Sequence, residues 1–187
     1  MDIVECADAA EWERWLELHH GTAAEAWLAI AKKGAPVPTV TRADALDVAL
    51  CFGWIDSQTR RIDEHRFVQR FSPRRKGSPW SMINVAKVAE LEAAGRMRPP
   101  GRAEVEAAQQ DGRWAAAYAS QSTASVPDEL ASALAADESA GAAFEALTRS
   151  RRYELLLPLL KARTPDGRAK CVERIVRRLG ETSVRRP

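Results

Sequence analysis

The side chains best suited to chemistry concentrate between positions 51 and 84 of this 187-residue chain. Arginine side chains in this segment offer paired donors for an anion, and serine and asparagine side chains add neutral donors. A helix predicted to begin near Pro79 would contribute backbone N–H groups and the positive end of its dipole. The pattern predicts a site for a small anion (phosphate or carboxylate) or a partner, with these members: Trp54, Asp56, Arg70, Arg74, Arg75, Trp80, Ser81 and Asn84.

A structural interpretation of the same segment competes with the binding site. Asp56 can pair with one of the neighbouring arginines, and Trp54 and Trp80 can act as packing residues. We favour this interpretation unless the arginines, Trp80 and Asn84 line one open pocket. The binding interpretation also requires the basic stretch at residues 74–76 to stay accessible to solvent.

Motifs of the common catalytic sites are missing from the sequence. It contains no GxSxG, no GxGxxG after a predicted strand, no GxxxxGK[ST] and no HExxH. The histidines share no predicted face and the cysteines form no CxxC pair: His19, His20 and His65; Cys6, Cys51 and Cys171. We therefore expect no catalytic residue, no metal site and no cofactor, and lean towards a protein that is not an enzyme.

The net charge of +2 hides a strong asymmetry along the chain. Residues 1–25 carry seven acidic side chains against Arg14, and residues 149–187 carry twelve Lys and Arg against four acids. A further seven basic side chains lie within residues 60–76. Such polarity indicates either an anionic partner or an internal match between an acidic first helix and a basic last helix, and both alternatives stay open.

The internal alternative needs apolar contacts as well as charge, because exposed ion pairs contribute little. The residues predicted to meet are Trp12, Trp15 and Leu16 with Val172, Ile175 and Val176. Nucleic-acid binding through the basic segments is a weaker alternative. Nucleic-acid binding would also require exposed aromatic side chains for stacking, and no aromatic residue lies beside the basic run near the C-terminus.

The apolar segments are short. Residues 155–160, interrupted by Pro158, fall far below the roughly 20 residues that a membrane span needs. The first residues are acidic and lack the basic start and apolar run of a signal peptide. Widely spaced cysteines suit a reducing compartment. We expect a cytoplasmic protein that does not insert into a membrane.

Local signals place the elements that must position the candidate site. Asp8 with Glu11, and Thr41 with Asp44, have the spacing of helix-capping boxes. Gly53 follows the second predicted helix, at the position where a left-handed backbone conformation commonly ends a helix. Ser78 is predicted to cap a third helix with Pro79 at its first position.

Between the second and third predicted helices, the spacing of apolar residues changes to every second residue, which is the period of a β-strand. Residues 54–62 and 67–71 are predicted to form a β-hairpin around a turn at residues 63–66. An isolated hairpin is only marginally stable, so it needs a third strand or helices. Residues 26–32 can be either element: Thr22 with Glu25 has capping spacing, yet the apolar run is short enough for a buried strand.

Beyond residue 98 the sequence contains the start signals of successive helices, with prolines at or near the predicted helix starts. The predicted fold class is α+β and mostly helical, with a small antiparallel sheet of two or three strands packed with helices and an all-helical C-terminal half. Residues 1–120 form the mixed α/β part and residues 121–187 the helical part packed on it, in one compact unit.

Several linked motifs resemble the bacteriocin-protection, YdeI/OmpD-associated family of bacterial proteins. They are Ala49-Leu50-Cys51-Phe52-Gly53-Trp54-Ile55-Asp56, Arg70-Phe71-Ser72-Pro73-Arg74-Arg75, Ser78-Pro79-Trp80-Ser81-Met82-Ile83-Asn84 and Gly95-Arg96-Met97. Gly112-Arg113-Trp114 with Tyr118, Pro127-Asp128-Glu129-Leu130 and Arg152-Tyr153 extend the resemblance over nearly the whole chain. Residues 162–168 depart from the family pattern before the last helix.

The resemblance implies a link to tolerance of bacteriocins and antimicrobial peptides and to association with an outer-membrane porin, with no established catalytic residue or cofactor. We therefore expect a non-enzymatic cytoplasmic binding protein that serves antimicrobial-peptide or envelope-stress tolerance. The alternative is an enzyme or small-anion binder that uses the cluster between residues 54 and 84. Its partner would be an unknown protein or a small anionic ligand.

Overall fold

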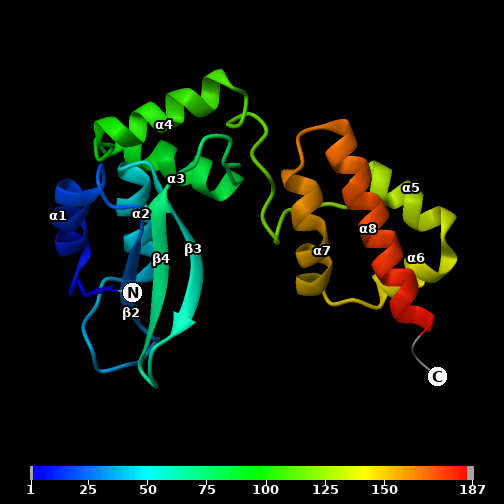
Figure 1. Cartoon of the computed structure of the whole chain (residues 1–187), viewed down its shortest axis with the longest axis horizontal. Helices are drawn as coiled ribbons and strands as arrows, with labels where there is room; N and C mark the ends of the chain where they lie inside the picture. The colour runs from blue at the N-terminus through cyan, green and yellow to red at the C-terminus, as the bar shows by residue number, and fades with distance from the viewer. Residues whose placement is uncertain (1, 185–187) are drawn as a thin grey trace. The chain divides into compact units, whose positions relative to one another are not determined.

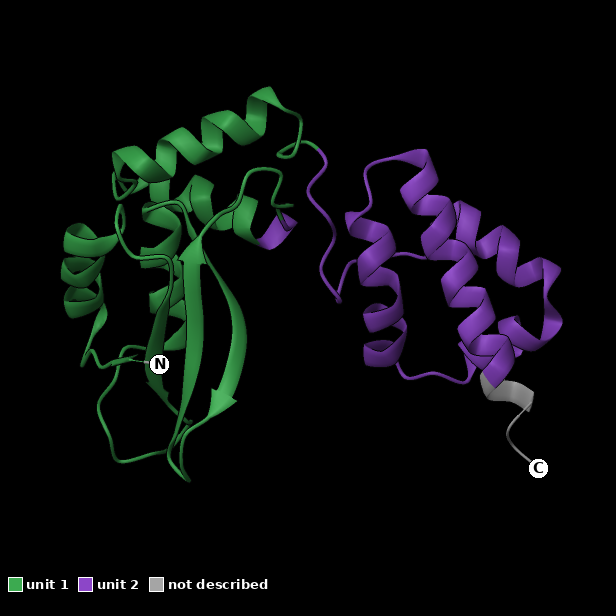
Figure 2. Cartoon of the chain, viewed as in Figure 1, with its two compact units in different colours: residues 1–80, 84–115 green, residues 81–83, 116–187 purple. Residues whose placement is uncertain are grey.

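The computed structural model describes residues 2–184, and its internal contacts divide the chain into two compact units (Figures 1 and 2). Residues 1–80 and 84–115 form the mixed unit, and residues 81–83 and 116–187 form the helical unit. The sequence-based boundary at residues 120 and 121, and the packing of the two parts into one body, stay predictions.

The elements follow the predicted α+β order. The first seven are β1 (Ile3–Val4), α1 (Ala9–His19), β2 (Ala26–Ala31), α2 (Arg42–Cys51), β3 (Trp54–Arg61), β4 (Arg66–Pro73) and α3 (Met82–Ala93). They are followed by α4 (Pro99–Gln110), α5 (Asp128–Ala136), α6 (Glu138–Glu145), α7 (Arg149–Lys161) and α8 (Pro165–Val184). From α5 onward the described chain is helical, as expected. None of the helices within residues 2–184 has the length and apolar character needed to cross a membrane.

The sheet of the mixed unit has four strands in the order β1-β2-β4-β3. The β3–β4 hairpin and the β2–β4 pair are antiparallel, whereas β1 runs parallel to β2. The predicted α+β class is confirmed, and the sheet has one strand more than its upper estimate. A strand of two residues carries no readable period, so β1 could not be found from the sequence.

Residues 26–31 form strand β2, which settles the choice between strand and helix. The strand lies between two neighbours, and five of its six residues are buried, which explains an apolar run without alternation. The helical interpretation was wrong about Glu25. Its carboxylate accepts hydrogen bonds from Trp27 Nε1 (2.8 Å) and from Arg70 Nε (2.7 Å).

Aromatic packing joins α1 to the sheet. Trp12 stacks on Trp15 with ring centroids 5.2 Å apart, and Phe71 of β4 lies 5.5 Å from Trp12. Trp15 in turn meets the edge of Trp54 at 6.0 Å. The indole of Trp12 donates to the carbonyl of Ala45 in α2 over 3.1 Å, which fixes the position of the second helix.

The predicted apolar contact between the first and last helices stays a prediction, because α1 and α8 belong to different units. Trp12 and Trp15 pack within the mixed unit, as described above. The apolar face of α8 packs within the helical unit instead. The buried residues of that core are Leu130, Leu134, Ala140, Phe144, Leu156, Leu159, Ile175 and Leu179. Each unit therefore has its own hydrophobic core, and neither needs the other to cover these side chains.

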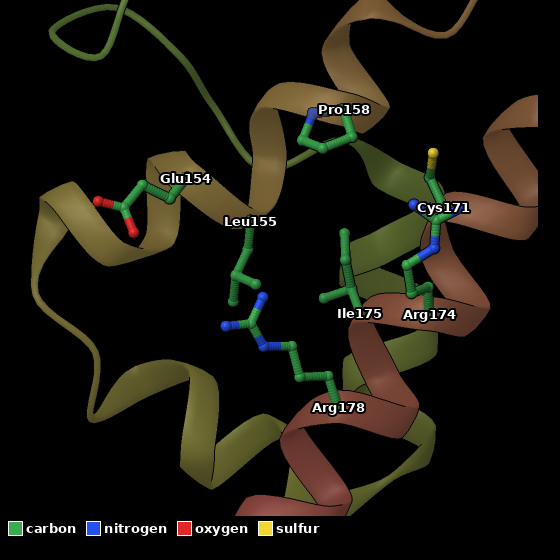
Figure 3. A pocket seen from close by; sticks show the side chains of 7 residues that line it. All are labelled: Glu154, Leu155, Pro158, Cys171, Arg174, Ile175 and Arg178. Atoms are coloured by element: carbon green, nitrogen blue, oxygen red, sulfur yellow. The ribbon is translucent and has the colours of Figure 1, made fainter. Parts of the chain in front are cut away.

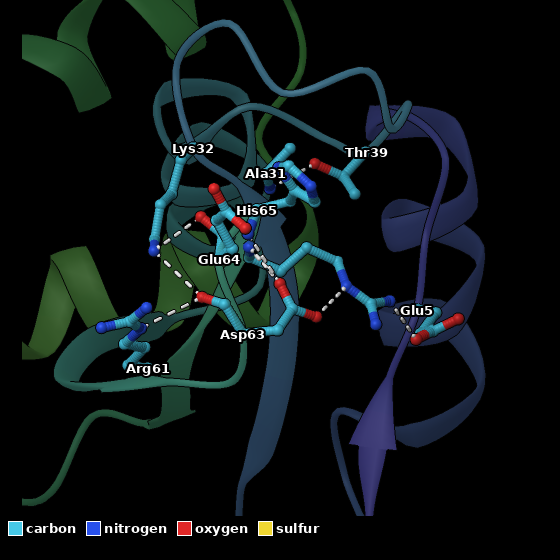
Figure 4. Close-up of polar contacts among 9 residues, drawn as sticks. Glu5, Ala31, Lys32, Thr39, Arg61, Asp63, Glu64 and His65 are labelled. Carbon is cyan, nitrogen blue, oxygen red and sulfur yellow. Dashed lines mark hydrogen bonds and ion pairs between the residues drawn. The ribbon is translucent and has the colours of Figure 1, made fainter.

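Charged side chains around the β3–β4 turn form hydrogen bonds with the turn itself (Figure 4). Asp63 Oδ1 accepts from the backbone N–H groups of His65 (2.8 Å) and Arg66 (2.7 Å), and Oδ2 accepts from Arg66 Nε. These hydrogen bonds, led by that from His65, lower the pKa of Asp63. Lys32 Nζ donates to the carbonyls of Asp63 and Glu64. Arg66 and Lys32 thus stabilise the turn.

Two glycines set the approach of α4 to the end of α2. Gly53 has a φ of 73°, as its position after α2 predicted. A Cβ on Gly101 would lie 2.2 Å from the carbonyl oxygen of Cys51, so the two backbones touch. That same carbonyl accepts a hydrogen bond from the N–H of Arg98 over 3.1 Å. Only glycine at position 101 permits this contact.

We predict that Gly101→Ala destabilises the protein by about 1–3 kcal/mol, the range for overpacking, because the new methyl group must push α4 away from α2. Gly180→Ala is the matched control within a helix, since no heavy atom lies within 4 Å of a Cβ at that position. It should stabilise by roughly 0.5–1 kcal/mol. Denaturation followed by circular dichroism measures both, and equal responses would contradict the assigned contact.

Candidate functional site

The two tryptophans of the predicted cluster are core residues. Trp54 is buried and packs against Trp15. Trp80 is also buried, with the ring of Trp114 at 4.8 Å and the guanidinium of Arg74 at 3.6 Å above its own ring. Of the eight predicted site residues, Arg74 and Trp80 are therefore in direct contact.

Asp56 and Arg70 lie on neighbouring strands but have different partners. Asp56 pairs with Arg42 at the start of α2, with 3.3 Å between nitrogen and oxygen. Arg70 pairs with Glu25 over 2.6 Å and donates to the hydroxyl of Ser57 over 3.2 Å. The structural interpretation foresaw an ion pair for Asp56, but the arginine comes from α2 rather than from the cluster.

Arg74 differs most from its prediction. It is only 8% exposed, whereas Arg75 and Lys76 are exposed, so the stretch at residues 74–76 is accessible at two of its three positions. Its guanidinium donates to the carbonyl of Pro79 over 3.2 Å, and its backbone N–H donates to Gly53. These bonds give Arg74 a structural role in holding the loop that follows β4.

A second buried arginine, Arg113, is not among the predicted site residues; its side chain is 2% exposed. It forms ion pairs with Glu104 (2.7 Å) and Asp111 (2.6 Å) and donates to the carbonyl of Ser78 over 3.1 Å. Burial opposes its charge, but the hydrogen bonds to Glu104 and Asp111 outweigh burial and raise its pKa. The pattern Asp111-Gly112-Arg113 looks like an ordinary polar turn, so only the fold reveals this cluster.

The third helix begins later than predicted. Helix α3 starts at Met82, and residues 78–80 precede it without helical structure. Their carbonyls are held by the two buried arginines described above, and the N–H of Met82 donates to Tyr118 over 2.9 Å. Ser81 and Asn84 therefore flank the true helix start, but Pro79 does not contribute the donors that the anion site assumed.

Ser81 belongs to the helical unit and the other seven predicted residues to the mixed unit. Ser81 is buried and forms an isolated bridge with Tyr118. The four pockets described for the structure are lined by other residues. A ligand-binding role of the eight residues stays a prediction. Within residues 2–184 no group of three His, Cys, Asp or Glu side chains is arranged to hold a metal ion.

A pocket of about 140 Å³ lies between α7 and α8 in the helical unit (Figure 3). Its lining comes from two turns of α7 and three of α8: Glu154, Leu155, Pro158, Cys171, Arg174, Ile175 and Arg178. Pro158 lies inside α7 and has no N–H to donate to the carbonyl of Glu154, so one backbone hydrogen bond of the helix is missing beside the pocket.

Apolar and cationic groups meet in this pocket. Ile175 is buried at its base, and Leu155 is half-buried at its side. Arg174 and Arg178 are exposed and lie one helical turn apart on α8. The carboxylate of Glu154 is already paired with Arg151 over 2.8 Å. At a second pocket, beside α5, the guanidinium of Arg168 is instead committed to Glu129.

We predict that Arg113→Ala costs about 3 kcal/mol of stability, because it strands the partly buried Glu104 and the carbonyl of Ser78. The estimate takes the low end of the range for a broken buried pair, since the Asp111 side chain is 45% exposed. The control is Arg151→Ala, which removes a pair with side chains 69% and 58% exposed and should cost at most about 1 kcal/mol. Urea denaturation separates the two, and a loss as small as the control's would refute the role of Arg113.

Comparisons with known proteins agree with this division of the chain. Residues 4–104 match the family model described as Domain of unknown function (DUF8412). Residues 123–182, within the helical unit, match the model described as Bacteriocin-protection, YdeI or OmpD-Associated, which confirms the resemblance for that part. The motifs between residues 49 and 97 lie in the first match instead. No curated protein and no solved structure matches the chain. Because the first model covers more than half of its length, the chain belongs to the DUF8412 family, and its helical unit carries a YdeI/OmpD-associated domain.

Proposed function

We propose that this protein is a non-enzymatic binding protein of the bacteriocin-protection type. It contributes to tolerance of antimicrobial peptides by binding a ligand between α7 and α8. The observation that carries the proposal is the position of the pocket: all its lining residues, from Glu154 to Arg178, lie inside the segment that matches the YdeI/OmpD-associated model.

The composition of the pocket supports binding rather than catalysis. A nucleophile needs a base within hydrogen-bonding reach. Cys171 is the nucleophilic group of the lining, and its neighbours there are apolar or cationic side chains and a carboxylate that is already paired. The chain's histidines (His19, His20 and His65) belong to the mixed unit. The proposal keeps the cytoplasmic location expected from the sequence, and cell fractionation tests it.

The role of the mixed unit in this proposal is structural support. Three of its arginines on or next to the sheet have carboxylate partners: Arg42 pairs with Asp56, Arg66 with Glu5 and Asp63, and Arg70 with Glu25. Such pairing reduces the charge that these residues can offer to a ligand. Small-anion binding by the 54–84 cluster and nucleic-acid binding by the basic segments remain alternatives. Phosphate titration and salt-dependent retention on DNA distinguish them.

We predict that cells without this gene are inhibited by lower concentrations of a cationic antimicrobial peptide than their parent. The intact gene should restore the parental value. A gene with Arg174→Glu and Arg178→Glu should not, because both positive charges of the pocket lining are replaced by negative ones. The measurement is the minimum inhibitory concentration, with immunoblots showing equal protein levels.

The matched control is Arg177→Glu, which reverses an exposed arginine of α8 outside the pocket lining and should restore tolerance. Unchanged sensitivity of the cells that lack the gene would refute the proposed function. Full restoration by the double variant would show that tolerance does not use this pocket.

A further inference from the structure

We propose that the groove between α5 and α8 binds a cationic amphipathic helix of a partner peptide or protein. The groove has a volume of about 500 Å³, and its lining comes mainly from α8: Glu129, Pro165, Arg168, Ala169, Val172 and Glu173. The inference does not rest on the proposed function, because none of these residues lines the pocket between α7 and α8.

The floor of the groove is a short apolar stripe on α8. Pro165, Ala169 and Val172 are spaced at i, i+4 and i+7, which places them on one face of the helix over two turns. Val172 packs against the hydrophobic core of the helical unit, whereas Pro165 and Ala169 are exposed. Ala169 is small, so another helix can approach α8 closely at this point. The stripe has the spacing of the anchor residues by which amphipathic helices bind in grooves.

An ion pair closes the side of the groove that faces α5. Arg168 Nε donates to Glu129 Oε1 over 2.6 Å and so links the two helices, which lie side by side (Figure 1). Arg168 Nη1 also donates to the carbonyls of Leu159 and Ala162 near the end of α7, both over 3.3 Å. The arginine of the lining is therefore committed to three acceptors of its own unit, and an anionic ligand would have to compete with them.

The opposite side of the groove carries a carboxylate. Successive residues of a helix are about 100° apart around its axis, so Arg168 and Glu173 flank the apolar stripe on opposite sides. Glu173 is exposed, and its side chain forms no ion pair or hydrogen bond within residues 2–184. Lys170, three residues before it, is paired with Asp166 over 2.7 Å. The carboxylate of Glu173 is therefore available to a cation.

The charge of the groove selects the partner. Its lining has two carboxylates against one guanidinium, and the first turn of α5 adds Asp128 beside Glu129. These charges repel an acidic partner, whereas Lys or Arg side chains of a bound helix can reach Glu173. The apolar face of that helix then covers Ala169, which removes apolar surface from water and supplies affinity.

A second copy of this chain is a poorer occupant. Its own basic amphipathic helix is α8, and the apolar face of that helix is already buried in the core through Ile175 and Leu179. The copy could offer this face only by unfolding its helical unit. A separate peptide or a helix of another protein has no such cost, so we assign the groove to a partner.

The test uses the full chain and a fluorescein-labelled model peptide about 18 residues long, because shorter helices are only marginally stable in water. The peptide carries Leu along one helical face and Lys along the other. One control peptide has Glu in place of every Lys, and another has the composition of the Lys peptide in an order without an apolar face. Fluorescence anisotropy measures the dissociation constants. The Lys peptide should bind about tenfold more tightly than either control, since binding needs both the charge and the apolar face.

Variants at exposed positions locate the site. Ala169→Arg places a bulky cation on the floor and should weaken the Lys peptide about tenfold, and Glu173→Lys should weaken it about fivefold because it turns an attraction into a repulsion. The matched controls are Ala142→Arg and Glu138→Lys, which change exposed residues of α6 outside the lining and should leave the affinity unchanged. Circular dichroism checks that every variant keeps its helical content.

Several results would overturn the proposal. They are no binding of the Lys peptide, equal binding of the Glu peptide, and control variants that weaken binding as much as Ala169→Arg and Glu173→Lys do. Sedimentation velocity measures the oligomeric state in parallel. A dimer that Ala169→Arg dissociates would show that a second copy occupies the groove, and would overturn the assignment to a partner.

The proposed function and this inference fail separately. The double variant Arg174→Glu with Arg178→Glu changes the pocket between α7 and α8 and leaves the lining of the groove intact. It should bind the Lys peptide as the unchanged protein does. A loss of peptide binding in this double variant, with no loss in Ala169→Arg, would assign the helix to the other pocket and refute the inference about the groove.

Discussion

Two buried guanidinium groups determine the path of the chain between the sheet and α3. Arg113, neutralised by Glu104 and Asp111, holds the carbonyl of Ser78, and Arg74 holds the carbonyl of Pro79 while it covers the ring of Trp80. A buried charge is costly unless it is paired and hydrogen-bonded, so each of these bonds restrains the loop as well as the arginine. Because residues 78–80 are held in this way, α3 cannot begin before Met82.

Arginines have different environments in the two units. In the segment between residues 51 and 84, Trp54 and Trp80 are buried and Arg70 is paired with Glu25. In the helical unit, by contrast, Arg174 and Arg178 are exposed beside apolar side chains. The same residue type is thus buried and paired at one place in the fold and exposed at another, depending on the groups that surround it.

Features that depend on neighbours within about four residues were predictable. Asp8 accepts the N–H of Glu11 and Thr41 accepts that of Asp44, so the caps of α1 and α2 lie where their spacing indicated. Gly53 has the expected left-handed conformation, and the hairpin of β3 and β4 follows the change to a period of two. The bonds that define these features lie within one turn or one hairpin, and their energies are already present in the local sequence.

The other features depend on contacts between residues far apart in the sequence and on burial. The local pattern of apolar residues does not predict such contacts. Residues 26–31 became a strand because β1 and β4 flank them and cover their backbone donors. Asp56 paired with Arg42 because α2 brings that arginine to the sheet, and Arg113 became a core residue because α4 presents Glu104 to it. The pocket between α7 and α8 arises from two separate helices, so its members are far apart in the sequence. The sequence by itself determined the helices, the hairpin and the family resemblance, whereas the tertiary structure decided which charges are buried and which are exposed, because the cost of burying a charge depends on the partners that the fold brings to it.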